Sequence, residues 1–265
     1  MSRRRRLACT AGAVWLAAVA VAGAAEEVRT IPTRPGVTQS FLLVRPSDPP
    51  VATVVLFAGG HGALGLGAGR LGLAGNFLVR NRARFAGQGL LVAVLDTPSD
   101  RPDGLDGFRT SAAHADDVRL VIAALRQVAA VPVWLVGTSM GTVSAASAAA
   151  RLGAAGADGL VLSSTVTRQG RERPESVGDV RLRNVRVPTL VVHHRDDACR
   201  ATPYADTLAL LRDLRQAPRR ELLTFQDGDP PRSGPCEAHS AHGFFGLDAE
   251  VVAAIAGWIK AVPRP

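Results

Sequence analysis

Apolar runs of strand length alternate with segments of helical periodicity along most of the chain. Each run holds six to eight residues rich in Val, Leu, Ile and Phe, and it ends at glycine, proline or polar residues. Continuous apolar runs of this length are typical of strands that are buried on both faces. We expect strands at residues 40–45, 52–57, 89–96, 131–137, 158–164, 187–194 and 220–225.

Segments with apolar residues on one helical face separate these runs. We expect helices at residues 77–88, 111–128, 141–153, 204–216 and 247–259. Strands that alternate with helices predict an α/β fold, a doubly wound and mostly parallel sheet with helices on both faces. With 265 residues, 47% of them hydrophobic, the chain can bury one large core, so we expect a single domain over residues 25–265.

Residues 1–24 depart from this pattern. Four arginines at positions 3–6 precede an apolar run over about residues 11–22, and small residues follow around Ala24 and Ala25. This order is typical of a secretory signal peptide. A permanent membrane anchor is the alternative, but the apolar run is short for a transmembrane helix. We therefore expect a signal peptide at 1–24, no stable membrane anchor, and a periplasmic or secreted protein.

Loss of the leader changes the charge of the chain. Four of the 31 basic residues lie in it and none of the 23 acidic ones, so the mature chain has 27 basic and 23 acidic side chains, a formal charge near +4. The chain has one tyrosine and no basic block interleaved with aromatic residues. This composition argues against a nucleic-acid partner.

Two cysteines remain once the leader and its Cys9 are removed, namely Cys199 and Cys236. An even number of cysteines in an oxidising compartment indicates a disulfide. Two separate buried thiols are the alternative.

The strand at residues 131–137 runs directly into Gly137-Thr138-Ser139-Met140-Gly141, and an alanine-rich helix follows without a loop. Such a sharp strand-to-helix turn exposes the serine at its apex, the setting of a nucleophile. Ser139 could instead be a helix N-cap. An N-cap does not require glycine on both sides, so the pattern favours a nucleophile, with the Met140 N–H as a donor to the oxyanion of a tetrahedral intermediate.

A serine nucleophile needs a base to remove its proton and an acid to orient that base. Asp196 and Asp197 follow the strand at 187–194, whose end should lie on the same sheet edge as Ser139. In folds with this serine turn the chain order is serine, acid, histidine, which leaves His239 and His242 as the base.

These segments together resemble the α/β-hydrolase superfamily, which often has His-Gly-x-x-Asp after the acid-bearing strand. Laid on residues 193–197, the pattern implies that Asp197 is the acid, although His194 stands where the family usually has glycine. His242-Gly243 resembles the catalytic histidine segment and implies that His242 is the base. Residues 58–62 resemble the oxyanion loop and imply the Gly60 N–H as second donor, with His61 as the alternative.

The resemblance extends over residues 41–260 in element order and implies an α/β-hydrolase fold similar to secreted serine esterases. The connection at 165–184 is too short for a large lid domain, so we expect a cleft for small or exposed esters. Secreted polyester hydrolases of this kind carry a disulfide near their acid and histidine loops, which supports a Cys199–Cys236 bridge. Asn76 and Arg80, with His61, are candidates for lining the site; an exposed helix face is the alternative for Asn76 and Arg80.

The implied activity is that of a carboxylesterase that forms an acyl-serine intermediate on a small-molecule acyl substrate, without metal or other cofactor. A peptidase or polyester hydrolase on the same triad is the alternative. A protein without activity on the same fold is a further class. The last class is a metal-dependent protein, whose ligands would come from His193, His194, Asp197, His239 and His242.

Overall fold

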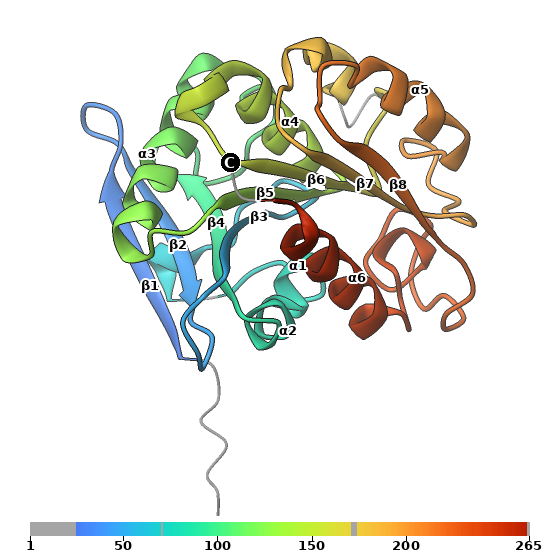
Figure 1. The fold of residues 1–265 in the computed structure, drawn as a ribbon, viewed down its shortest axis with the longest axis horizontal. Helices are drawn as coiled ribbons and strands as arrows, with labels where there is room; N and C mark the ends of the chain where they lie inside the picture. The colour runs from blue at the N-terminus through green and yellow to red at the C-terminus, as the bar shows by residue number, and fades with distance from the viewer. Residues whose placement is uncertain (1–24, 70, 171–173, 264–265) are drawn as a thin grey trace, which may run out of the picture.

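The computed structural model describes residues 25–69, 71–170 and 174–263, so the signal peptide expected at 1–24 lies outside the described residues. An eight-stranded sheet with the order β1-β2-β4-β3-β5-β6-β7-β8 forms the centre of the molecule (Figure 1). The strands are β1 (Glu26–Pro32), β2 (Thr38–Val44), β3 (Ala52–Phe57), β4 (Leu90–Pro98), β5 (Val133–Thr138), β6 (Gly159–Ser163), β7 (Thr189–His194) and β8 (Arg220–Phe225).

Six of the strands, from β4 to β8 along the sheet, run parallel, and β2 pairs antiparallel with both β1 and β4. The α-helices are α1 (Phe77–Arg80), α2 (Arg82–Gly87), α3 (Ala112–Val128), α4 (Gly141–Leu152), α5 (Thr207–Asp213) and α6 (Asp248–Ala261). Short 3-10 helices are η1 (Leu66–Ala68), η2 (Gly153–Ala155), η3 (Val177–Asp179), η4 (Leu182–Asn184), η5 (Tyr204–Asp206) and η6 (Ala241–Gly243). The predicted doubly wound, mostly parallel α/β fold is confirmed.

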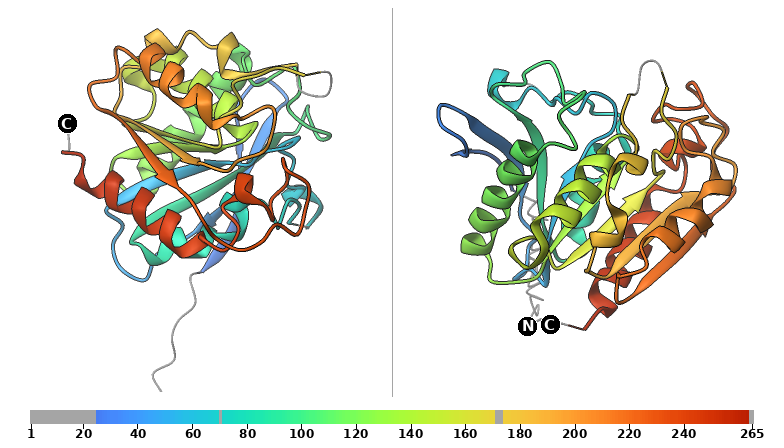
Figure 2. Two further views of the ribbon diagram at one scale, coloured as in Figure 1. Left: turned by 90° about the vertical axis from the view of Figure 1, so that its right-hand side faces the viewer. Right: turned by 90° about the horizontal axis from the view of Figure 1, so that it is seen from above.

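Helices cover both faces of the twisted sheet (Figure 2). One face carries α3, α4 and α5, and the other carries α1, α2 and α6 (Figure 1). Each face has its own apolar core: Val118, Val143 and Leu210 belong to the first, and Phe85 and Ile255 to the second. The sheet is therefore buried on both sides, as its continuous apolar runs require.

Three elements differ from the expectation. The first strand, β1, was not expected, because its residues are mostly exposed and polar and it pairs only at the sheet edge. The helix expected at 77–88 is divided at Asn81, whose side chain donates to the Phe77 carbonyl and to Asp248. The helix expected at 204–216 begins as a 3-10 turn and ends at Asp213.

The strand register brings four strand ends to one edge of the sheet. Phe57 of β3 is opposite Gly137 of β5, and Thr138 is opposite Ser163 of β6. Ser163 is in turn opposite Val192, near the end of β7. Open parallel sheets bind ligands beyond these carboxyl ends. Within the described part of the chain, no helix has the length and apolar character needed to cross a membrane.

Candidate active site

Ser139 lies at the apex of the turn from β5 to α4. Its φ is 52°, in the left-handed region, and its N–H donates to the Ser163 carbonyl at 3.1 Å. A Cβ on Gly137 would collide with the backbone of Gly141, and one on Gly141 would collide with the Phe57 carbonyl. Both glycines are therefore required by close backbone contacts, and the turn has the strained strand-to-helix geometry of a nucleophile elbow, with Ser139 half-buried at its apex.

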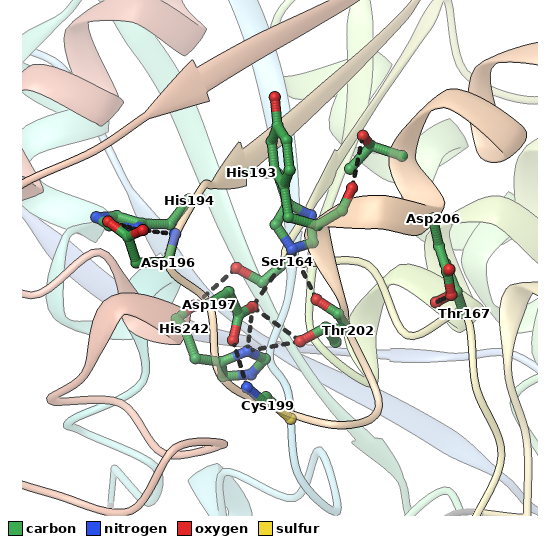
Figure 3. A network of polar contacts seen from close by, with 12 residues as sticks. Ser164, Thr167, His193, His194, Asp196, Asp197, Cys199, Thr202, Asp206 and His242 are labelled. Carbon is green, nitrogen blue, oxygen red and sulfur yellow. Dashed lines mark hydrogen bonds and ion pairs between the residues drawn. The ribbon is translucent and has the colours of Figure 1, made fainter.

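Asp197 and His242 lie together at the same edge, although 45 residues separate them. The His242 Nδ1 is 3.0 Å from the Asp197 Oδ2 (Figure 3). The side chains of both residues are buried. A carboxylate that accepts from Nδ1 fixes the proton there and leaves Nε2 unprotonated, the form that a general base needs.

The carboxylate of Asp197 is held by further donors. The Cys199 N–H donates to Oδ1 at 2.9 Å and the Thr202 hydroxyl to Oδ2 at 2.8 Å (Figure 3). Burial alone would raise the pKa of Asp197, but hydrogen bonds from His193 and His242 outweigh burial and hold the pKa well below its usual value. Asp197 is therefore an anion at neutral pH, ready to pair with an imidazolium.

The structure separates the candidates that the sequence left open. The side chain of Asp196 is 69% exposed and its nearest partner is His194, so it does not contact His242. His239 is exposed and packs against Phe245. Asp197 and His242 are therefore the acid and histidine that the fold brings together.

Backbone contacts connect His242 with the serine turn. Ser164, which follows β6, donates from its hydroxyl to the His242 carbonyl at 2.7 Å (Figure 3). Its neighbour Ser163 accepts the hydrogen bond of Ser139 N–H. No hydrogen bond joins the Ser139 hydroxyl to the His242 ring among the described residues. Such bonds are often long without substrate and shorten when it binds.

The loop after β3 lies against the serine. A Cβ on Gly59 would be 2.9 Å from the Ser139 Cβ, and Gly60 has a φ of 61°, which glycine adopts without strain. Neither the Gly60 N–H nor the Met140 N–H donates to another described residue. The buried carboxylate of Asp96 accepts the N–H groups of Leu64, Gly65 and Leu66 and so anchors the loop.

The expected disulfide between Cys199 and Cys236 is present. Cys199 follows Asp197 by two residues, and Cys236 precedes His242 by six. The bridge therefore ties the segment that carries the acid to the segment that carries the histidine.

The residues expected to line the site have other partners. Arg80 donates to Asp248 and to the carbonyls of Gly75, Ala238 and Gly243, so it is neither on an exposed face nor free for a substrate anion. Asn76 caps α1 by accepting from the Leu78 N–H, and its amide group lies near Gly59. His61 is exposed, and its Nδ1 accepts from the Ala63 N–H.

Three polar residues at the site had no assigned role in the triad. His193 was considered above only as a possible metal ligand, yet its Nε2 lies 2.8 Å from the Thr202 carbonyl and 3.4 Å from the Asp197 Oδ2. Its place near the end of the strand that directly precedes the acid is a signal that sequence analysis could have used. Thr202 and Ser164 have no such signal, since Thr202 reaches Asp197 only through the irregular fold of the loop between them, and Ser164 contacts His242, 78 residues later.

The metal-site alternative has no geometric support in the part of the chain that the structure describes. It contains no group of three or more His, Cys, Asp or Glu side chains that could hold an ion. The His194 Nε2 instead faces the Asp227 carbonyl at 2.9 Å.

A groove of about 1060 Å³ lies at the opposite edge of the sheet, between residues such as Trp134, Pro188 and Ile259, and shares no residue with the triad.

No protein-family model and no curated protein matches the chain. Solved structures do match it. An α/β serine hydrolase without a lid from Xanthomonas campestris is 19% identical, with a TM-score of 0.60 over 90% of this chain and 97% of the other. An esterase from Pyrococcus furiosus is 12% identical, with a TM-score of 0.64 over 89% and 91%. A thermostable carboxyl esterase from Bacillus coagulans is 13% identical, with a TM-score of 0.58 over 90% and 99%. At these identities the likeness establishes a shared fold.

Proposed function

We propose that this chain, which has the α/β-hydrolase fold without a large lid domain, is a serine hydrolase of carboxylic esters. The observation that carries the proposal is the Asp197–His242 pair, joined at 3.0 Å on the sheet edge that also bears Ser139. The esterase names of the structural neighbours support the same class of reaction. Fold alone does not dictate a reaction, so the site carries the argument.

In the proposed reaction the Ser139 Oγ forms a bond to the ester carbonyl carbon while its proton passes to the His242 Nε2. Asp197 stabilises the imidazolium through Nδ1. The carbonyl oxygen takes up the electron pair and becomes an oxyanion, which the N–H groups of Gly60 and Met140 stabilise. The tetrahedral intermediate then collapses, the proton moves from His242 to the departing alkoxide oxygen, and an alcohol leaves an acyl-Ser139.

Water completes the cycle by the reverse sequence. It loses a proton to the His242 Nε2 as its oxygen attacks the acyl carbon, and the second intermediate releases the carboxylic acid and returns the proton to Ser139. The mechanism uses no metal or cofactor. The 165–184 connection contains only the short turns η3 and η4 among its described residues, which supports small or exposed esters as substrates.

A peptidase or polyester hydrolase would use the same triad, so a panel of small esters, peptides and a polyester film distinguishes the three. We further infer that the mature single domain over residues 25–265 acts in the periplasm or outside the cell. The Cys199–Cys236 bridge supports this location, because structural disulfides persist in oxidising compartments.

The test uses a fluorophosphonate probe and a small activated ester. Wild-type protein should be labelled and should hydrolyse the ester, and Ser139→Ala should lose both while it keeps the wild-type circular dichroism spectrum. Ser147→Ala, a buried serine of α4, is the matched control and should be labelled normally. Wild-type turnover by folded Ser139→Ala would disprove the proposal.

A further inference from the structure

Arg109 is buried without a carboxylate partner. Its exposed fraction is 1%, and it lies in the segment between β4 and α3. Its Nη2 donates to the Gly60 carbonyl at 2.6 Å and its Nη1 to the Ser144 hydroxyl at 3.2 Å, while its Nε has no partner in the part of the chain that the structure describes. Among the described residues, no carboxylate lies within ion-pair distance of the guanidinium.

An unpaired charge in this position is costly to the fold. Burial lowers the pKa of Arg109 to about 10, against a weaker opposite effect of the Glu175 and Asp106 charges. The side chain therefore remains a cation at neutral pH. A neutral side chain of similar length would fill the same space without this desolvation cost, so packing does not explain why the residue is an arginine.

The loop that Arg109 contacts is the candidate oxyanion loop. Gly59 lies against Ser139, as described above, and a Cβ on Gly62 would be 3.3 Å from the Arg109 Nη2. Gly60, between them, has left-handed backbone and accepts the hydrogen bond from Arg109. The loop thus passes between the nucleophile and the guanidinium, with glycine at both close contacts.

Arg109 is itself held in place from two sides. Glu175 accepts hydrogen bonds from the Gly107 N–H at 2.9 Å and from the Thr110 N–H at 3.3 Å, which fixes the turn that carries the arginine. Ser144 belongs to α4, the helix that begins directly after Ser139. The guanidinium is therefore anchored to the same rigid elements as the nucleophile.

We propose that Arg109 is a positioning residue of the oxyanion hole: it holds the Gly60 carbonyl, and so the residue whose own N–H is the candidate donor, and it adds a buried positive charge behind the loop. The inference rests on the proposed function. As the bond from Ser139 forms, the substrate carbonyl oxygen gains the electron pair, and a fixed cation in a low-dielectric site lowers the energy of that negative charge. The charge needs no reorganisation during the reaction, since it is already in place.

The test compares Arg109→Met, which removes the charge, with Arg109→Lys, which retains it. The matched control is Arg151→Met, an exposed arginine whose Nη2 also donates to a backbone carbonyl, that of Thr110. Steady-state kinetics on a small activated ester give kcat and KM. Inhibition by a trifluoromethyl ketone, which adds to the serine as a hemiketal oxyanion, reports the stabilisation of the intermediate.

We expect Arg109→Met to lower kcat roughly 10- to 100-fold with KM within about two-fold of wild type, and to raise the inhibition constant by the same factor as it lowers kcat. Arg109→Lys should keep more activity than Arg109→Met. Because a buried lysine loses its proton at lower pH than arginine, kcat of the lysine variant should also fall at alkaline pH while its melting temperature does not. Arg151→Met should behave as wild type.

Amide hydrogen exchange of the loop provides a readout that needs no substrate. Exchange over residues 58–63 should be faster in Arg109→Met than in wild type and unchanged in Arg151→Met. Unchanged loop exchange in folded Arg109→Met would overturn the positioning role whether or not the protein is an esterase. If Arg109→Met does not fold, Arg109→Lys becomes the test of the proposal. A kcat of Arg109→Lys that stays constant at alkaline pH, with an inhibition constant equal to that of wild type, would overturn the proposal.

Different outcomes would refute the proposed function and the role of Arg109. A wild-type protein that neither hydrolyses esters nor reacts with the fluorophosphonate probe would refute the serine hydrolase and the oxyanion role together, and the exchange experiment would still show whether Arg109 holds the loop. In an active enzyme, equal kcat in wild type and Arg109→Met would refute the role of Arg109 alone.

Discussion

Ser164 donates a hydrogen bond of 2.7 Å from its hydroxyl to the backbone carbonyl of His242. The contact fixes the backbone of the histidine from the end of β6, whereas Asp197 fixes its ring from the segment after β7. Contacts from two neighbouring strands therefore determine where the candidate base lies, and a separate variant can test each contact.

Ser164→Gly should lower kcat roughly 10- to 100-fold with little change in KM, because a small displacement of a catalytic group is costly to rate. Glycine suits the φ of 44° at this position, so the variant removes the hydroxyl without new backbone strain. Thr165→Val is the control, since the buried Thr165 hydroxyl has no partner among the described residues. Equal kcat in Ser164→Gly and wild type would show that the contact does not position His242.

Asp197→Asn should lower kcat/KM by roughly four orders of magnitude, because an amide no longer enforces the proton on Nδ1 of His242. Asp196→Asn changes an exposed neighbour and should keep nearly the full rate. Ester hydrolysis by the two purified variants gives the comparison. The opposite ranking would assign the acid to Asp196.

The stability effect of Asp197 should depend on pH. Its pKa is lowered in the folded protein, so its ionised form stabilises the fold above the unfolded pKa, near 3.8, and the stabilisation is lost as pH falls through the folded value. The difference in free energy of unfolding between wild type and Asp197→Asn should therefore be largest at neutral pH and shrink below about pH 4. Urea unfolding at pH 7 and pH 3 measures it, and a constant difference would contradict the expectation.

Replacement of both cysteines, Cys199→Ser with Cys236→Ser, should lower the free energy of unfolding by up to about 4 kcal/mol, the chain-entropy value for a loop of this length. Activity should fall as well, because the acid and histidine segments lose their covalent link. Differential scanning calorimetry and ester kinetics test both effects, and reducing agent should not change the double variant further. Peptide mapping that finds two free thiols in periplasmic protein would refute the role of the bridge.

His114 should make the fold sensitive to mild acid. Its ring is fully buried beside Phe57 and Phe108, and both ring nitrogens lack partners within the described ranges. Burial, together with the Arg109 and Arg34 charges, lowers its pKa to about 3. Between pH 6.5 and 3 only the unfolded chain binds this proton, so stability falls as pH falls in that range. At pH 5 the loss is about 2 kcal/mol relative to pH 7.

His114→Phe should remove that loss, because a phenyl ring fills the same apolar space and binds no proton. Urea unfolding of wild type and variant at pH 7 and pH 5 is the measurement. An equal decrease in both proteins would show that His114 does not carry the effect.

Features that depend on neighbouring residues could be predicted from the sequence. The apolar run at 131–137 predicts β5, and the glycines around Ser139 predict its turn, because both are local backbone requirements. The polar edge strand β1 could not be predicted in this way, since its partner β2 supplies the hydrogen bonds. At the break between α1 and α2 the Asn81 side chain likewise contacts Asp248, a residue far along the chain that no local pattern reveals.

In the candidate site, too, the contacts between residues distant in sequence could not be predicted from local patterns. Asp197 and His242 were selected by resemblance to a family pattern, and the structure places them in contact. The surroundings of Arg80 could not be predicted, because four of its five acceptor contacts are made with Ala238, Gly243 and Asp248, more than 150 residues later in the chain. Arg109 carries no sequence signal, since its partner Gly60 lies 49 residues earlier.

The contact between Arg80 and Asp248 also bears on when, during synthesis, the proposed enzyme could become active. The base His242 and Asp248, the carboxylate that holds Arg80, are both synthesised after Ser139 and Asp197. A nascent chain that stops at residue 240 has the serine and the acid but no base. On the proposed function, a chain that lacks His242 and Asp248 has no base and no carboxylate to hold Arg80, so such incomplete chains do not attack esters inside the cell that makes them.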